Sequence, residues 1–333
     1  MRVLVTGGTG FIGSHTCVEL INAGHEVVIV DNLYNSSIDV LDKIETICGI
    51  KPKFYKVDIL DKQNLEEVFK ENKFDACIHF AGYKAVGESC QIPLTYYRNN
   101  VSGSLNLYEL LIKYGVNNLV FSSSATVYGN NFEVPFKEEY GYGTTTNPYA
   151  TTKLMNEMII NDLCKANSNM SAVILRYFNP IGAHESGLIG EIPNGIPNNL
   201  VPYIAQVEKG QREYLKVFGD DYDTKDGTGV RDYIHVVDLA KAHIKAIEYA
   251  YNHKGSETIN VGTGIGYSVL EILKAYEKAC GHEIAYKIVE RRPGDIATCY
   301  ADTNKAKKLL NFETQYGIDK MCEDTYRFYS NLK

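Results

Sequence analysis

Short apolar runs alternate with longer helical patterns through the first half of the chain. The apolar runs predict buried strands at residues 3–5, 25–31, 53–57, 75–80, 118–123 and 171–176. Helical patterns fall between them, at about residues 14–23 with Gly24 as a C-cap, after the N-cap Asp61, at 96–114 and from Asn147-Pro148 onward. Strict strand–helix alternation predicts an α/β fold, with a doubly wound parallel sheet covered by helices on both faces.

Beyond residue 178 the pattern loosens. Proline, glycine and asparagine cluster between residues 180 and 202, and shorter elements follow. The sequence therefore predicts a larger sheet domain over residues 1–178 and a smaller C-terminal α/β lobe over residues 179–333.

Bulk composition narrows the function classes. The chain has 333 residues, 44% of them hydrophobic, and a net charge of −7, which argues against nucleic acid or an anionic membrane as a partner. We find no apolar stretch of about 18 residues and no charged-then-apolar leader, so we expect a soluble, cytoplasmic protein. The eight cysteines include no Cys-x-x-Cys pair, so we expect no metal site.

A glycine-rich segment directly follows the first predicted strand. Residues 6–13 read TGGTGFIG, and their Gly-x-Gly-x-x-Gly spacing is typical of a turn that places a pyrophosphate at a helix N-terminus. The second predicted strand ends at Asp31, eighteen residues past Gly13. A carboxylate there accepts hydrogen bonds from a ribose and repels a 2′-phosphate, so the sequence predicts NAD rather than NADP.

A tyrosine and a lysine one helical turn apart form the candidate catalytic pair. Tyr149-x-x-x-Lys153 places a phenol and an ammonium on one helix face, where the positive charge favours the phenolate. The same spacing recurs at residues 316/320 and 329/333. Of the three, the first alone follows the fifth predicted strand, where Ser124 supplies a hydroxyl for the substrate oxygen. We therefore predict Tyr149, Lys153 and Ser124 as the catalytic residues.

These motifs resemble the UDP-glucose 4-epimerases, a family of extended short-chain dehydrogenases/reductases. The resemblance runs from residue 1 to about 329 and is carried by residues 6–13, 80–89, 122–129, 149–153, 176–180, 195–200 and 227–236. The chain departs from the family pattern in residues 150–152, which read ATT where Gly, Lys and Ser are usual, and at Phe11, where Tyr is more frequent. Neither departure changes the predicted catalytic residues.

The resemblance implies an isomerase of galactose metabolism that uses bound NAD and forms a homodimer. Its reaction would invert C4 of UDP-glucose and UDP-galactose through a 4-keto intermediate with transient NADH. Cys299 falls where family members that also accept UDP-N-acetylhexosamines carry a small residue, so we expect interconversion of UDP-GlcNAc and UDP-GalNAc as well.

The family's binding residues carry over to matching positions. The implied NAD contacts are Gly7, Gly10, Phe11, Ile12, Gly13, Asp31, Asn32, Leu33, Tyr34, Asn35, Ser36, Asp58, Ile59, Phe80, Ala81, Gly82, Tyr83, Lys84, Asn99, Ser124, Tyr149, Lys153 and Phe178. The implied UDP-sugar contacts are Lys84, Ser124, Tyr149, Asn179, Asn199, Leu200, Lys216, Val217, Phe218, Arg231, the run from Arg292 to Asp295, and Cys299. Two arginines on one diphosphate would match its charge and geometry.

Two alternatives remain open. A nucleotide-sugar 4,6-dehydratase needs an acidic pair beside the catalytic hydroxyl, where this chain has Ala125-Thr126. A non-catalytic NAD-sensing protein would be expected to have lost one of the three predicted catalytic residues, and all three are present.

Overall fold

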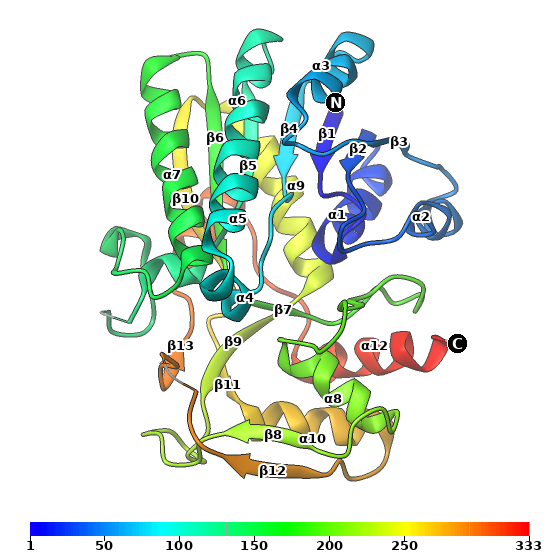
Figure 1. Cartoon of the computed structure of the whole chain (residues 1–333), viewed down its shortest axis with the longest axis vertical. Helices are drawn as coiled ribbons and strands as arrows, with labels where there is room; N and C mark the ends of the chain where they lie inside the picture. Colours follow the sequence, from blue (N-terminus) through cyan, green and yellow to red (C-terminus); the bar gives the residue numbers. More distant parts are fainter. Residues whose placement is uncertain (131, 293, 333) are drawn as a thin grey trace.

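A parallel sheet forms the centre of the larger lobe in the computed structural model, which describes residues 1–130, 132–292 and 294–332 (Figure 1). Within these residues the sheet has seven strands in the order β10-β6-β5-β4-β1-β2-β3, all paired in parallel. Its strands are β1 (Arg2–Thr6), β2 (Glu26–Asp31), β3 (Lys53–Lys56), β4 (Ala76–His79), β5 (Asn118–Ser124), β6 (Ser171–Tyr177) and β10 (Gly255–Val261).

Helices cover both faces of this sheet. One face packs on α1 (Phe11–Asn22), α2 (Val40–Cys48), α9 (Val236–Asn252) and α11 (Asn304–Leu310), and the other on α3 (Lys62–Glu71), α6 (Gly103–Lys113) and α7 (Pro148–Ala166). In β1, Val3 and Val5 enter the first core and Leu4 the second, because alternate strand residues point to opposite faces. No helix in the described part of the chain is long and apolar enough to cross a membrane.

The helix expected at residues 96–114 is interrupted. The structure has α4 (Val86–Gln91) and α5 (Pro93–Tyr97), then a π-helical turn, η1 (Arg98–Ser102), and only then α6. Inside that turn the Asn100 amide donates to the Tyr83 carbonyl at 3.0 Å and to the Thr152 hydroxyl at 3.1 Å. These side-chain hydrogen bonds stabilise the π turn, which the hydrophobic periodicity of the sequence does not predict.

The smaller lobe packs three helices against short strands. A mixed sheet contains β7 (Asn179–Ile181), β9 (Val230–His235), β11 (Gly266–Ser268) and β13 (Thr298–Cys299), and a parallel pair contains β8 (Leu215–Phe218) and β12 (Tyr286–Val289). Its core includes residues of α8 (Leu200–Glu208), α10 (Val269–Cys280) and α12 (Ile318–Asn331).

The chain crosses between the lobes more than once. It first leaves the larger lobe after β6, close to the predicted boundary at 178/179. It then returns, because α9 packs on α1 and β10 pairs with β6 at the sheet edge. Helix α9 and strand β10 thus belong to the larger lobe, as does α11, which the prediction of a continuous lobe over 179–333 did not anticipate. A helix–strand unit after a long insertion carries no local signal of which sheet it joins.

Candidate active site

The carboxyl ends of the parallel strands bring the predicted cofactor residues to one edge of the sheet. Parallel pairing places the ends of β1, β2, β4, β5 and β6 side by side. In open α/β sheets, ligands bind at this edge.

The glycine turn leaves no room for side chains. Gly7 has a φ of +73°, and a Cβ added to it would lie 2.7 Å from the Ala81 backbone nitrogen. A Cβ on Gly13 would collide with the Gly7 carbonyl oxygen. Helix α1 begins at Phe11, earlier than the predicted residue 14, and its N-cap Gly10 supplies no side-chain hydrogen bond. The first N–H groups of α1 are therefore available to an anion, as a pyrophosphate site requires.

Asp31 ties the glycine turn to the loop after β2. Its carboxylate accepts hydrogen bonds from the Thr9 backbone N–H at 3.2 Å, the Leu33 N–H at 2.8 Å and the Ser36 hydroxyl at 3.3 Å. Leu33 has a φ of +62°, a left-handed conformation unusual for leucine. The negative charge thus lies where the sequence predicted the ribose contact.

The loops after β2, β3 and β4 meet beside it. The Asn32 amide donates to the Asp58 carboxylate at 2.8 Å, and the rings of Tyr34 and Tyr83 lie 4.7 Å apart. The structure therefore brings these predicted cofactor residues together. Asn99, in the π turn, instead donates to Asn100 at 2.9 Å within the buried interior.

Helix α7 carries the predicted base and lysine. Its N-cap Asn147 accepts a hydrogen bond from the Ala150 N–H at 2.9 Å, so the helix begins where the sequence predicted. Lys153 is buried, and its ammonium donates to the Ser122 carbonyl at 2.6 Å and lies 5.9 Å from the centroid of the Tyr149 ring. Ser124, at the end of β5, accepts from both the N–H and the hydroxyl of Thr126.

Burial dominates the proton affinities of this pair. It raises the pKa of the Tyr149 phenol, although interaction with the Ser124 hydroxyl opposes the rise. Burial also lowers the pKa of Lys153 to about 8, which the Glu157 carboxylate opposes. The predicted lowering of the phenol pKa by Lys153 is therefore not found in this arrangement. Desolvation of the phenol outweighs an ammonium that is directed at the β5 backbone.

The predicted UDP contacts line the smaller lobe. A pocket of about 450 Å³ is lined by Lys216, Phe218, Val289, Glu290, Arg291 and Arg292. The Arg292 guanidinium lies 4.8 Å from the centroid of the Phe218 ring and donates to Asp295 at 2.9 Å. Arg231, on β9, faces the other oxygen of Asp295 at 3.9 Å. The two arginines predicted for the diphosphate thus share one carboxylate.

Two predicted substrate residues have apolar side chains that pack in the core of the smaller lobe. Val217 is buried in the core of the smaller lobe, and Leu200 packs against the same core at the start of α8. Residue 293, within the predicted run from Arg292 to Asp295, lies outside the described residues.

Glu191 joins two predicted site residues from different lobes. Its Oε1 accepts from the Lys84 ammonium at 2.7 Å and from the Asn199 amide at 2.8 Å. The sequence did not predict Glu191, which lies in the glycine- and proline-rich connection without a motif of its own. The sequence alone does not identify a mostly buried glutamate in such a loop as a site residue, because its role is clear only once the positions of its two partners are known.

Cys299 lies at the edge of a small core cluster that begins one residue after Ser124. It packs against a small core that contains Ala125 and Phe178, and in β13 it is the register partner of Arg231. Burial raises the pKa of its thiol to about 12, so the side chain behaves as a small neutral group.

A glycine turn with Asp31 at one edge of a parallel sheet, and a Ser124–Tyr149–Lys153 set beside it, define an extended short-chain dehydrogenase/reductase. The sequence model of the NAD dependent epimerase/dehydratase family matches residues 3–262, and the chain belongs to this family. The predicted α/β class and family are confirmed.

Three proteins similar to this chain carry the name UDP-glucose 4-epimerase. The UDP-glucose 4-epimerase of Bacillus subtilis is 57% identical over 99% of this chain and 97% of its own length. A Stenotrophomonas maltophila UDP-glucose-4-epimerase, solved with NAD and formylated UDP-arabinopyranose, matches with a TM-score of 0.97 at 48% identity, covering 99% and 98% of the chains. A Bifidobacterium longum UDP-glucose 4-epimerase, solved with NAD⁺ and UDP, matches with a TM-score of 0.96 at 53% identity and the same coverage.

Proposed function

We propose that this protein interconverts UDP-glucose and UDP-galactose by inverting C4, with NAD as a resident cofactor. The observation that carries the proposal is the arrangement at the end of β5, where the Lys153 ammonium donates to the Ser122 carbonyl and lies 5.9 Å from the centroid of the Tyr149 ring, and where the Tyr149 phenol interacts with the Ser124 hydroxyl. The identity to enzymes of this name extends over nearly the whole chain, which supports the same activity here.

The residues at the sheet edge fit NAD. The crowded Gly7 and Gly13 and the uncapped N-terminus of α1 would hold the pyrophosphate, and Asp31 would hold the ribose. Bound NAD would supply reversible hydride-transfer chemistry at C4 of the sugar. A positive nicotinamide ring near Tyr149 would also offset the desolvation that raises the phenol pKa.

The chain's own residues move the proton and hold the substrate. Tyr149 as phenolate takes the proton of the sugar 4-hydroxyl and returns it after inversion, while Ser124 hydrogen-bonds the same oxygen. Arg231 and Arg292 hold the diphosphate by charge-assisted hydrogen bonds. Anchoring at UDP leaves the 4-keto sugar free to turn between the two hydride transfers.

The experiment that tests this function is incubation with UDP-galactose and separation of the products. Formation of UDP-glucose, with a return reaction from UDP-glucose, supports the proposal. A 4-keto-6-deoxy sugar would identify a dehydratase, and absence of turnover with NAD retained would favour a sensor. The local structure favours the epimerase over the dehydratase, because Thr126 donates its hydroxyl to Ser124 at the position where elimination needs an acid.

A second proposed activity is the interconversion of UDP-GlcNAc and UDP-GalNAc. Its support is the small side chain of Cys299 against Ala125 and Phe178, which leaves more room than a tyrosine would. An N-acetyl group on C2 sweeps a larger volume as the sugar turns.

We also propose a homodimer formed through α5, α6 and α7. Figure 1 shows these helices on the outer side of the larger lobe. Large apolar side chains are exposed on all three, namely Leu94, Leu105, Ile112, Met155 and Met158. Exposed apolar groups concentrated in this way are typical of protein–protein contact. Molar mass from light scattering would test this, and a monomer at micromolar concentration would refute it.

A further inference from the structure

A fully buried ion pair lies directly behind the proposed catalytic residues. Glu157 on α7 is 0% exposed and Arg176 on β6 is 2% exposed. The guanidinium donates from Nη2 to Oε2 at 2.7 Å, and from Nε to Oε1 and Oε2 at 3.0 and 3.2 Å. Moving two charges out of water costs free energy that their mutual attraction often does not recover. Stability alone therefore does not explain an ion pair that is fully buried.

Further contacts connect the pair to the surrounding elements. The Ser123 hydroxyl donates to Glu157, and Ser123 is the register partner of Arg176 between β5 and β6. Arg176 also donates from Nη1 to the Gly141 carbonyl at 2.9 Å and lies between the rings of Tyr128 and Tyr142, 4.7 and 5.1 Å from their centroids. The pair therefore joins α7, two central strands and the segment that precedes α7.

Each end of this connection lies next to a catalytic residue. Glu157 follows Lys153 by one helical turn and Tyr149 by two, so all three share one face of α7. Ser123 immediately precedes Ser124 on β5. We propose that Glu157, held by Arg176, is a positioning residue that fixes Tyr149 and Lys153 relative to Ser124 and keeps an anion next to the Lys153 ammonium. The inference deepens the proposed function and rests on it.

The groups around Lys153 give Glu157 a distinct electrostatic role. In the described residues the titratable and charged groups on α7 near Lys153 and on the elements packed there include Tyr149 and Glu157 on α7, Glu88 on α4, Tyr96 on α5, His79 on β4, Tyr108 on α6, Tyr128 at residues 125–128, and Arg176 and Tyr177 on β6. Burial lowers the pKa of His79 to about 3 and raises those of Tyr108 and Tyr177, so these three are neutral near neutral pH, and the Glu88 carboxylate accepts from the Tyr96 hydroxyl at 2.6 Å. The carboxylate that raises the pKa of Lys153 is Glu157, and its loss would lower that pKa further.

The decisive variant is Glu157→Gln, with UDP-galactose turnover measured from about pH 6 to about pH 9.5. We expect kcat to fall at least tenfold, as ~1.4 kcal/mol of lost transition-state stabilisation implies, with KM for UDP-galactose little changed. We also expect the alkaline limb of kcat to move down by about one pH unit, because Lys153 loses its proton earlier. Glu157→Asp keeps the charge and should restore the alkaline limb.

A second variant keeps the inference testable if Glu157→Gln does not fold. Glu157→Gln leaves the Arg176 charge buried and unpaired, which is strongly destabilising, whereas replacing both partners is often tolerated. The double variant Glu157→Gln/Arg176→Gln removes the anion without an orphaned cation and should show a downward shift of the same sign but smaller, because the Arg176 charge is removed as well. If the alkaline limb is unshifted in whichever of these variants folds, the inference is overturned. The proposed function is tested separately, by UDP-galactose turnover in the wild type.

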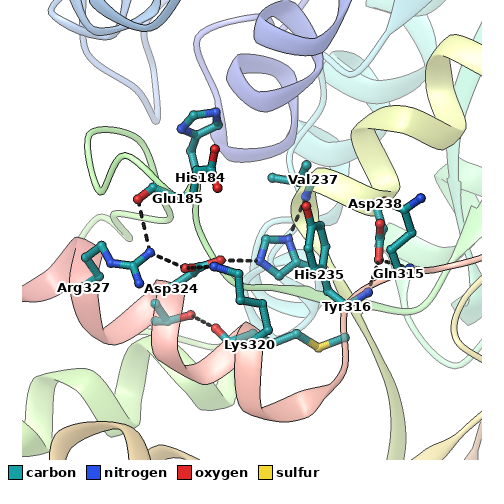
Figure 2. Close-up of polar contacts among 12 residues, drawn as sticks. His184, Glu185, His235, Val237, Asp238, Gln315, Tyr316, Lys320, Asp324 and Arg327 are labelled. Atoms are coloured by element: carbon teal, nitrogen blue, oxygen red, sulfur yellow. Dashed lines mark hydrogen bonds and ion pairs between the residues drawn. The ribbon is translucent and has the colours of Figure 1, made fainter.

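The matched control is a buried carboxylate in the other lobe. Figure 2 shows Asp324 on α12, which accepts from His235 at 3.1 Å and from Lys320 at 2.8 Å and is 1% exposed. It is not among the groups facing Lys153. Asp324→Asn should lower thermal stability while the pH profile keeps its wild-type limbs. A downward shift there as well would show that general loosening moves the profile, and would also overturn the inference.

Discussion

The Lys153 ammonium donates a 2.6 Å hydrogen bond to the Ser122 carbonyl, the residue two positions before the proposed catalytic serine. The bond fixes the first turns of α7 against the end of β5. It also directs the ammonium at the backbone, 5.9 Å from the centroid of the Tyr149 ring. Burial raises the pKa of the Tyr149 phenol, so the phenol stays protonated until further positive charge is placed nearby.

Tyr149→Phe is expected to abolish catalysis without unfolding the protein. The change deletes one buried oxygen and keeps the ring, so thermal stability and NAD content should remain close to wild type. Loss of a general base lowers turnover by about a hundredfold to ten-thousandfold. UDP-galactose turnover and the melting temperature, measured on one preparation, check both parts. Epimerisation near the wild-type rate would end the assignment of the base.

Lys153→Met should make the protein more stable and far less active. The pKa of Lys153 falls from 10.5 to about 8 on folding, so the unfolded chain binds more protons between these values. Stability contributed by this group therefore rises with pH through that window, and at neutral pH the buried ammonium is a penalty. Its removal should raise the free energy of unfolding by up to about 3 kcal/mol near pH 7, and the gain should vanish above about pH 10.5.

Urea titrations of Lys153→Met and wild type at neutral and alkaline pH measure this difference. Turnover of the variant should fall steeply, because the phenol loses the neighbouring positive charge. A variant less stable than wild type at neutral pH would show that the Ser122 hydrogen bond outweighs the desolvation of the ammonium.

Asp31 should restrict the cofactor to NAD. Its carboxylate accepts from Thr9, Leu33 and Ser36, and in the proposed cofactor site it would repel a 2′-phosphate. Protein purified without added cofactor should release NAD or NADH when denatured, as chromatography of the supernatant would show. Asp31→Ala should accept NADP more readily than wild type does. Release of NADP by the wild type would contradict the role of Asp31.

The parts of the fold and site that follow local rules could be predicted from the sequence. The Asn147 cap, the β5 strand and the glycine turn each carry their signal within a few residues, and the structure has all three. The π turn around Asn100 and the return of β10 to the larger sheet depend on contacts with distant residues, such as Thr152 and β6. The pairing of Glu157 with Arg176 could not be predicted for the same reason. In the sequence, a buried charge pair looks like two solvated charges, and only the packing of the helix on the strand brings them together.

Cys299→Tyr should separate the two proposed activities. Cys299 packs against the core cluster that contains Ala125 and Phe178, so a phenol ring there would fill space that an N-acetyl group would cross in the proposed reaction as the sugar turns. We expect turnover of UDP-GalNAc to fall at least about tenfold, the usual effect of steric exclusion from a pocket, while UDP-galactose turnover changes little. Cys299→Ala serves as the control and should keep both activities, because the neutral thiol contributes size alone. Loss of both activities in Cys299→Tyr would indicate general overpacking. Retained UDP-GalNAc turnover in that variant, or none in the wild type, would refute the size argument.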